Sequence, residues 1–222
     1  MHRFAEVSAV IFDMDGLVLD TESTYFAAWQ KAAELMGECL SDDFFKSLSG
    51  MHYIDIQQKL RATCGESFDL NAFHQIGGRI WRETVYVDGI QIKPGVIELL
   101  EYLAEKQMPY CLATNSLAIN AYECLELAQI KDRFPTVITR DDVLKGKPAP
   151  DLFIKAADIL NTPLDRCMIL EDSATGIEAA VQSGAFSIFI PSTELIDPFT
   201  AQRCDFMFKD LCEVLQVLES KQ

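Results

Sequence analysis

The chain has 222 residues and a formal net charge of −15 at pH 7, with 49% apolar and 24% charged residues. This composition is typical of a folded domain that is long enough to bury its own core. No run of basic residues occurs, which argues against nucleic acid or an anionic membrane surface as a partner. The apolar stretch near the N-terminus is too short for a signal peptide, and no segment reaches the roughly 18 apolar residues of a membrane span. Seven cysteines without a C-x-x-C pair indicate reduced thiols, so we expect a cytoplasmic protein.

Short apolar segments recur along the chain and predict strands that are buried on both faces of a sheet. Between the later segments lie helical patterns at 94–106, 117–130 and 151–160. A further helix is expected to begin after Ser173, a residue type that caps helix N-termini, and to end at Gly184. This alternation predicts an α/β fold with a doubly wound parallel sheet. The predicted strands are 7–12, 110–114, 136–139, 167–170, 186–190 and 206–208.

Residues 20–91 break this alternation, because helical segments follow one another there without a buried strand between them. These segments cover residues 21–37, 51–63 and 70–87. We therefore expect a helical domain, residues 20–91, inserted into a core domain made of residues 1–19 and 92–222.

Carboxylates, hydroxyls and a lysine follow the ends of the first four predicted strands. In open parallel sheets, ligands bind beyond the carboxyl ends of the strands, so these side chains are expected to meet at one edge. Oxygen ligands of this kind suit Mg²⁺, which would offset the repulsion between clustered carboxylates and bridge to a phosphate. One aspartate would attack phosphorus, and the other would protonate the leaving oxygen and later deprotonate water. The candidates are Asp13 and Asp15 after the first strand, Thr114 and Asn115 after the second, Lys147 after the third, and Glu171 and Asp172 after the fourth.

Ordered motifs in these segments resemble those of the haloacid dehalogenase superfamily. They are "DMDG" (13–16), "TNS" (114–116), "GKPAPD" (146–151) and "LEDSATGIEAA" (170–180). The helical insertion resembles the α-helical cap of the beta-phosphoglucomutase-like branch of that superfamily. The resemblance implies a Rossmann-like core, a mobile cap and Mg²⁺-dependent phosphoryl transfer through an aspartyl-phosphate.

The resemblance also implies a role for each matching residue. Asp13 matches the nucleophile, which is also a metal ligand, and Asp15 matches the general acid/base, which ligates the metal through its backbone carbonyl. The remaining matches are Thr114 and Asn115 to the phosphate-binding motif, Lys147 to the charge-stabilising lysine, and Glu171 with Asp172 to the acidic metal motif.

Residues of the expected cap help to distinguish a phosphatase from a sugar-phosphate mutase. Related mutases have a histidine in the first cap helix and an arginine after the cap-loop glycine, where this chain has Tyr25 and Tyr53. Those basic groups would hold the second phosphate of a bisphosphate, so their absence favours hydrolysis. Thr21 matches a hinge position that orients the acid/base, and it equally fits a helix N-cap. The candidate specificity residues are Thr21, Glu22, Tyr25, His52 and Tyr53.

We therefore predict a monomeric, Mg²⁺-dependent phosphatase that acts on a small phosphorylated metabolite, such as a sugar phosphate or a related compound. One alternative is a beta-phosphoglucomutase-type mutase that uses the same site. Another is a relative that binds ligands without catalysis. A signalling receiver domain has similar strand-end residues, but it is about half this length and lacks a helical insertion.

Overall fold

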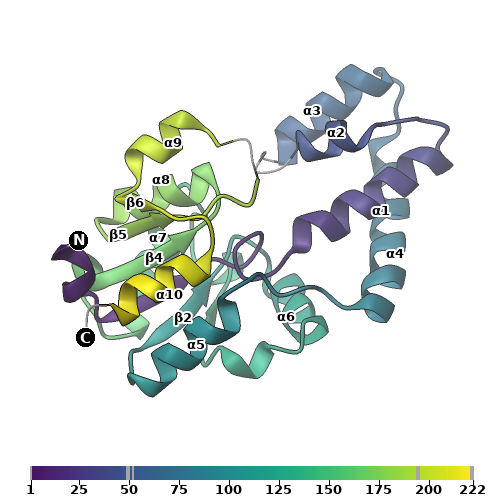
Figure 1. Ribbon diagram of the computed structural model, residues 1–222. Coiled ribbons are helices and arrows are strands. Elements are labelled where there is room, and N and C mark those ends of the chain that lie inside the picture. Colours follow the sequence, from purple (N-terminus) through teal and green to yellow (C-terminus); the bar gives the residue numbers. More distant parts are fainter. Residues whose placement is uncertain (1, 49–50, 52, 194–195, 221–222) are drawn as a thin grey trace. The chain divides into compact units, whose positions relative to one another are not determined.

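The computed structural model describes residues 2–48, 51, 53–193 and 196–220 (Figure 1). Internal contacts divide the chain into two compact units. The first unit combines Met1–Asp20 with Gln91–Gln222, and the second is Thr21–Ile90.

Within its described residues, the first unit contains a six-stranded sheet in which neighbouring strands are parallel. The strands are β1 (Ala9–Phe12), β2 (Tyr110–Ala113), β3 (Val137–Ile138), β4 (Cys167–Glu171), β5 (Phe186–Phe189) and β6 (Phe206–Met207). Their order, β3-β2-β1-β4-β5-β6, means that the chain winds outward from β1 and then returns to wind outward from β4. The predicted doubly wound parallel sheet is therefore confirmed, and each predicted strand is present. The winding direction switches between β1 and β4, which is where ligands bind in sheets of this kind.

The helices of the first unit include two that the sequence analysis missed, α9 and α10. The described helices are α5 (Val96–Glu105), α6 (Ala118–Leu127), α7 (Asp151–Ile159), α8 (Ala174–Ser183), α9 (Pro198–Arg203) and α10 (Leu211–Glu219), with 3-10 helices η1 (His2–Glu6), η2 (Lys131–Arg133), η3 (Arg140–Asp142) and η4 (Leu164–Arg166). As predicted, Ser173 caps α8, and Gly184 ends it with a φ of 81°.

Helices α9 and α10 start after Asp197 and Asp210, whose carboxylates accept hydrogen bonds from backbone N–H groups. No described helix is both long and apolar enough to cross a membrane.

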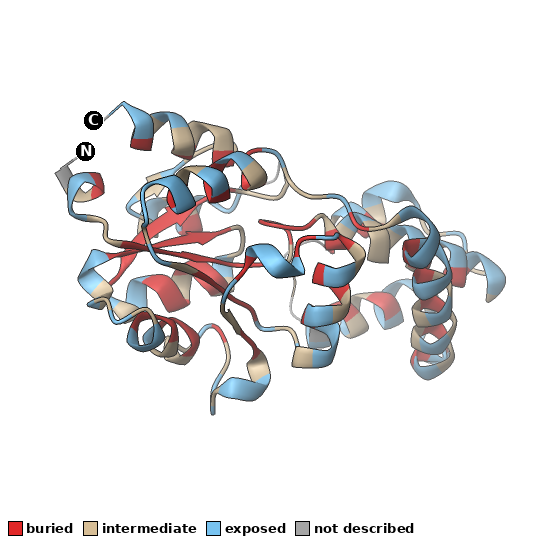
Figure 2. Ribbon diagram, turned by 90° about the horizontal axis from the view of Figure 1, so that it is seen from below, coloured by how far each residue is buried: buried red, intermediate tan, exposed pale blue. Residues whose placement is uncertain are grey.

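Helices cover both faces of the sheet, so its central strands are buried along their whole length (Figure 2). Helices α7 and α8 lie on one face, and α5 and α10 lie on the other (Figure 1). Ile11 and Ile169 belong to a core cluster with Phe153 of α7. Phe12, one residue along β1, packs its ring against Phe134, because successive strand residues point to opposite faces. This burial explains why the strands are continuous apolar runs in the sequence.

The regular secondary structure described in the second unit consists of helices. Its helices are α1 (Thr21–Leu35), α2 (Asp42–Lys46), α3 (Tyr53–Cys64) and α4 (Leu70–Asp88). Helices α1 and α4 pack against each other, and a core with Phe73, Leu60 and Leu48 joins the unit together. Helix α2, which has five residues and is capped by Ser41, is not among the predicted helices.

Candidate active site

Lys147 joins three neighbouring strand ends at the carboxyl edge of the sheet. Its ammonium group donates hydrogen bonds to the carboxylate of Asp13, after β1, and to that of Glu171, at the end of β4, the latter at 2.6 Å. A third bond, 2.9 Å long, ends on the carbonyl oxygen of Ala113 in β2. Lys147, Asp13 and Glu171 are 8%, 6% and 0% exposed, so their charges are buried together. The sheet thus assembles these side chains from distant parts of the sequence.

The backbone of Lys147 is held by Asn115, which follows β2. The amide Nδ2 of Asn115 donates to the Lys147 carbonyl oxygen at 3.1 Å, and the Lys147 N–H donates to Asn115 Oδ1 at 2.8 Å. Gly146 allows this close approach, because a Cβ at that position would lie 2.3 Å from Asn115 Oδ1. Both ends of the amide are engaged in this way. The amide Nδ2 carries a second N–H, so Asn115 can hold the Lys147 backbone and still donate to a phosphate.

Glu171 is fixed by the start of α8 as well as by Lys147. Its Oε2 accepts hydrogen bonds from the N–H groups of Asp172 and Ser173 at 3.0 and 3.2 Å, and from the Ser173 hydroxyl at 3.0 Å. Gly176 is needed for this packing, since a Cβ there would lie 1.8 Å from the carboxyl carbon of Glu171. A helix N-terminus stabilises an adjacent carboxylate. Both carboxylate oxygens of Glu171 therefore have donors.

Asp15 faces the end of β2. Its Oδ2 accepts hydrogen bonds from the hydroxyls of Ser116, at 2.8 Å, and Thr114, at 3.3 Å. The N–H of Ser116 in turn donates to the Thr114 hydroxyl oxygen at 2.9 Å. Ser116 is not among the predicted site residues, although its position in the "TNS" motif is a signal that could have identified it.

Acidic groups cluster at this edge. The Lys147 ammonium group bonds to the carboxylates of Asp13 and Glu171, a carboxylate oxygen of Asp172 lies within 4.8 Å of theirs, and the charge of Asp15 acts on Asp13. Burial raises the pKa of Asp13 well above its usual range, and the charges of Glu171 and Asp15 raise it further, although Lys147 opposes them. Burial alone would lower the pKa of Lys147, but the Asp13 and Glu171 carboxylates outweigh it and raise that pKa. The cluster therefore favours a further positive charge.

The donor set fits a divalent metal ion. Asp13, Glu171 and Asp172 each offer a carboxylate oxygen, and these oxygens lie within 4.8 Å of one another. Hard cations prefer oxygen ligands of this kind. Gly16 makes room for Asp172, because it has a φ of 84° and a Cβ there would lie 2.1 Å from Asp172 Oδ2. The acidic cluster at the switch point is thus a candidate metal centre.

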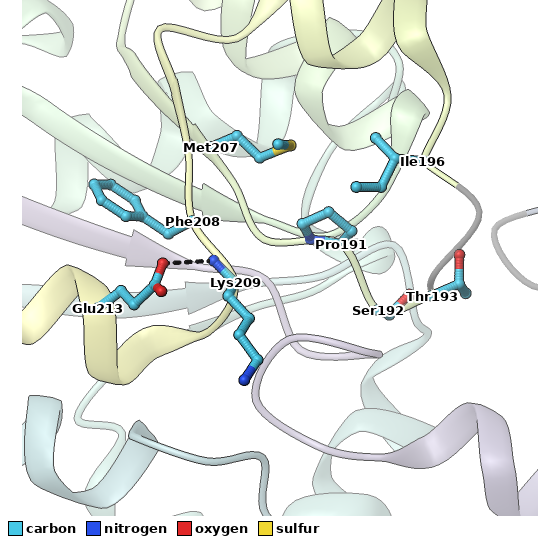
Figure 3. A pocket seen from close by; sticks show the side chains of 8 residues that line it. All are labelled: Pro191, Ser192, Thr193, Ile196, Met207, Phe208, Lys209 and Glu213. Carbon is cyan, nitrogen blue, oxygen red and sulfur yellow. Dashed lines mark hydrogen bonds between the residues drawn. The ribbon is translucent and has the colours of Figure 1, made fainter.

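A pocket of about 520 Å³ lies beside this edge, at the ends of β5 and β6 (Figure 3). Ser192, which lines it, adjoins the loop after β1, since its Cβ lies 3.3 Å from the position that a Cβ on Gly16 would take. The other walls include Pro191, Phe208 and Lys209. None of the carboxylates that meet Lys147 lines it, so we assign the chemistry to the Lys147 cluster and not to the pocket.

The specificity candidates of the second unit are only partly described. Thr21 is buried and is the first residue of α1, where its carbonyl oxygen accepts a bond of 2.6 Å from the Thr24 hydroxyl. The ring of Tyr25 stacks on that of Trp81, with centroids 4.7 Å apart. His52 lies outside the described residues, and Tyr53 is the first residue of α3. The roles of these residues and of Glu22 in specificity stay predictions.

Comparison with known proteins gives the family of the chain. The family described as haloacid dehalogenase-like hydrolase matches residues 10–190. A phosphorylated carbohydrates phosphatase from Thermotoga maritima is 29% identical over 193 residues, which are 82% of this chain and 84% of that protein. A beta-phosphoglucomutase from Bacillus subtilis is 29% identical over 188 residues, 82% of each chain. The crystal structure of a haloacid dehalogenase hydrolase of family IA, variant 3, from Entamoeba histolytica has a TM-score of 0.75 and 26% identity, covering 96% of this chain and 100% of that one.

The chain therefore belongs to the haloacid dehalogenase-like hydrolases, as the motifs indicate. Within that family it is an enzyme of the phosphatase type, which confirms the predicted enzyme class. Its acidic cluster matches the divalent-metal requirement expected of such an enzyme.

Proposed function

We propose that this protein is a Mg²⁺-dependent phosphomonoesterase that hydrolyses a small phosphorylated metabolite, such as a sugar phosphate, through an aspartyl-phosphate at Asp13. The observation that carries the proposal is the buried contact of Lys147 with both Asp13 and Glu171 at the switch point of the sheet. A lysine placed there holds the nucleophile and offers positive charge to a phosphoryl group.

In the first step, a carboxylate oxygen of Asp13 attacks phosphorus and the bond from phosphorus to the leaving oxygen breaks. Asp15 gives a proton to that oxygen, so the leaving group departs as an alcohol. The Thr114 hydroxyl and Lys147 hold phosphoryl oxygens during the transfer. Asn115 contributes by fixing the backbone of Lys147.

In the second step, a water molecule attacks the phosphorus of the aspartyl-phosphate. Asp15 accepts the proton from this water, the bond from phosphorus to the Asp13 oxygen breaks, and inorganic phosphate forms. Asp15 thus acts as acid and then as base, and the site returns to its starting state.

Magnesium is the ion that we propose for the acidic cluster of Asp13, Asp172, Glu171 and the Asp15 carbonyl. When bound, it would neutralise these carboxylates and the charge of the phosphoryl group. The hydrogen bonds on both carboxylate oxygens of Glu171 would fix its orientation beside the other ligands.

The substrate class rests on the relatives. One similar protein is named a phosphorylated carbohydrates phosphatase and another a beta-phosphoglucomutase, so phosphorylated sugars are the first compounds to test. Tyr25 stands where mutases of this branch have a basic residue, which favours hydrolysis over the mutase alternative. A cytoplasmic location, a monomeric state and a cap formed by residues 20–91 stay predictions.

The test is phosphate release from a panel of phosphorylated sugars, polyols and small acids, with Mg²⁺ and with EDTA. We expect Mg²⁺-dependent release that disappears in Asp13→Asn. Conversion of a hexose 1-phosphate to its 6-phosphate without net release would instead establish the mutase. If neither reaction occurs with any compound of the panel, the proposal is refuted. The alternative that remains is a protein that binds ligands without catalysis.

A further inference from the structure

Ser116 holds a carboxylate that the proposed reaction needs in one orientation. Its hydroxyl donates to Asp15 Oδ2 at 2.8 Å, which is a shorter bond than the 3.3 Å contact from Thr114 to the same oxygen. Ser116 is half-buried, and it follows β2 closely enough for its N–H to bond to the Thr114 hydroxyl oxygen at 2.9 Å. The backbone therefore fixes Ser116, and Ser116 fixes Asp15.

The hydroxyls of Thr114 and Ser116 have different roles in the proposed reaction. The reaction proposed above uses the Thr114 hydroxyl for a phosphoryl oxygen, and that contact competes with its longer bond to Asp15. The bond from Ser116 to Asp15 is not affected by this competition. Since both bonds end on Oδ2, they restrict the rotation of the Asp15 carboxyl group.

We infer that Ser116 is a positioning residue, which aims the Asp15 carboxyl group at the leaving oxygen of the substrate. The inference rests on the proposed function, because it gives Ser116 a role only in a reaction where Asp15 delivers a proton. In that step the bond from phosphorus to oxygen breaks, the proton passes from Asp15 to the leaving oxygen, and Asp15 becomes a carboxylate. Ser116 exchanges no proton itself.

A positioning role for the proton donor predicts a dependence on the leaving group. An alkyl phosphate, such as a sugar or polyol phosphate, leaves as a strongly basic alkoxide unless it is protonated. The 4-nitrophenyl group leaves as a stable anion and needs little protonation. General acid catalysis supplies on the order of a hundredfold or more where it is required, and almost none where it is not.

The experiment compares the kcat/KM of Ser116→Ala on the best alkyl phosphate of the panel with its kcat/KM on 4-nitrophenyl phosphate, because kcat/KM reports the first transfer and excludes the later hydrolysis of the aspartyl-phosphate, which both substrates share. We expect kcat/KM to fall about tenfold or more on the alkyl phosphate and less than about threefold on the aryl phosphate. The ratio of the two rates is independent of the fraction of folded enzyme, so a destabilised variant does not imitate this result. Ser116→Thr, which keeps a hydroxyl, is expected to retain the wild-type ratio. Ser183→Ala removes a hydroxyl that donates to a backbone carbonyl of α8 and serves as the matched control.

Equal losses of Ser116→Ala on both substrates would overturn the inference while leaving the proposed function intact. Failure of the wild-type enzyme to hydrolyse either phosphate would refute the proposed function, and the role of Ser116 would fall with it. These outcomes are distinguishable because the wild-type rates are measured first.

Discussion

Asn115 and Lys147 are joined by two hydrogen bonds that run in opposite directions between the Asn115 amide and the Lys147 backbone. The Lys147 ammonium then reaches Asp13, Glu171 and the Ala113 carbonyl from a fixed starting point. The geometry of the central cation therefore depends on a side chain from a different strand end. Substitution of Asn115 therefore tests whether the position of Lys147 depends on this amide.

Asn115→Ala is expected to lower kcat about tenfold, which corresponds to about 1.4 kcal/mol and to the loss of one or two hydrogen bonds. Steady-state kinetics on the best substrate of the panel measure this effect. Asn120→Ala is the matched control, because Asn120 is an exposed asparagine in the first turn of α6. Unchanged kcat in Asn115→Ala would mean that Lys147 is positioned without the amide.

Lys147→Met is expected to lower the free energy of unfolding in EDTA by about 3–5 kcal/mol, because it leaves two buried carboxylates without their cation. Urea denaturation measures the change, and phosphatase activity should be lost as well. The same substitution at Lys155, whose bond to Asp142 is exposed, should cost less than about 1 kcal/mol. Equal effects of the two substitutions would contradict the buried charge cluster.

Asp13→Asn is expected to raise the melting temperature in EDTA at neutral pH. The pKa of Asp13 is raised by burial, so the folded protein binds the proton more tightly than the unfolded chain does. The stability of the wild type should therefore fall as the pH rises from the ordinary aspartate pKa of 3.8 through the raised value, and the variant should lack this loss. Calorimetry from pH 5 to neutrality, at roughly one-unit steps, measures the difference. A variant that is less stable than the wild type at every pH would show that Asp13 is well compensated by Lys147 alone.

In the presence of Mg²⁺, the wild type is expected to be more stable than Asp13→Asn, which is the reverse of the order in EDTA. An ion that binds only the folded state adds about 2.7 kcal/mol at a hundredfold excess over its dissociation constant. The wild type should gain this stabilisation, and Asp13→Asn should gain clearly less because it lacks a ligand. Equal stabilisation of both proteins by Mg²⁺ would place the ion elsewhere.

Gly176→Ala is expected to destabilise the protein by about 2 kcal/mol or more and to reduce activity, since the added methyl group occupies the space of the Glu171 carboxylate. Gly78→Ala provides the opposite case, because a Cβ at this position in α4 meets nothing within 4 Å. The control should gain about 0.5–1 kcal/mol from its higher helix propensity. Thermal unfolding of both variants distinguishes the crowded glycine from the open one.

The sequence predicts the sheet and the composition of the site because both have local signals. Buried strands are apolar runs, and the parallel sheet brings their carboxyl ends together, which places Asp13 and Glu171 near each other. Ser173 and Gly184 mark the ends of α8 in the sequence and in the structure. Helix α10 also has a local signal, the cap at Asp210 followed by apolar residues at helical spacing, and the sequence analysis overlooked it.

The contacts that orient the site have no such signal. Gly176 matters because Glu171 of β4 turns toward the start of α8, and Gly146 matters because Asn115 approaches it from another strand. Such approaches depend on the tertiary fold and leave no pattern in the sequence. The bonds of Asn115 to the Lys147 backbone could not be predicted for this reason, and its contact with phosphate stays a prediction.

In the proposed reaction, Asp13 takes the phosphoryl group from the substrate. The most direct measurement is acid quenching of the enzyme during turnover of its best substrate, with Mg²⁺ present, followed by mass spectrometry of its peptides. We expect a phosphoryl group on Asp13 in the wild type and none in Asp13→Asn. Hydrolysis without a phosphorylated peptide, or with the phosphoryl group on Asp15, would contradict it.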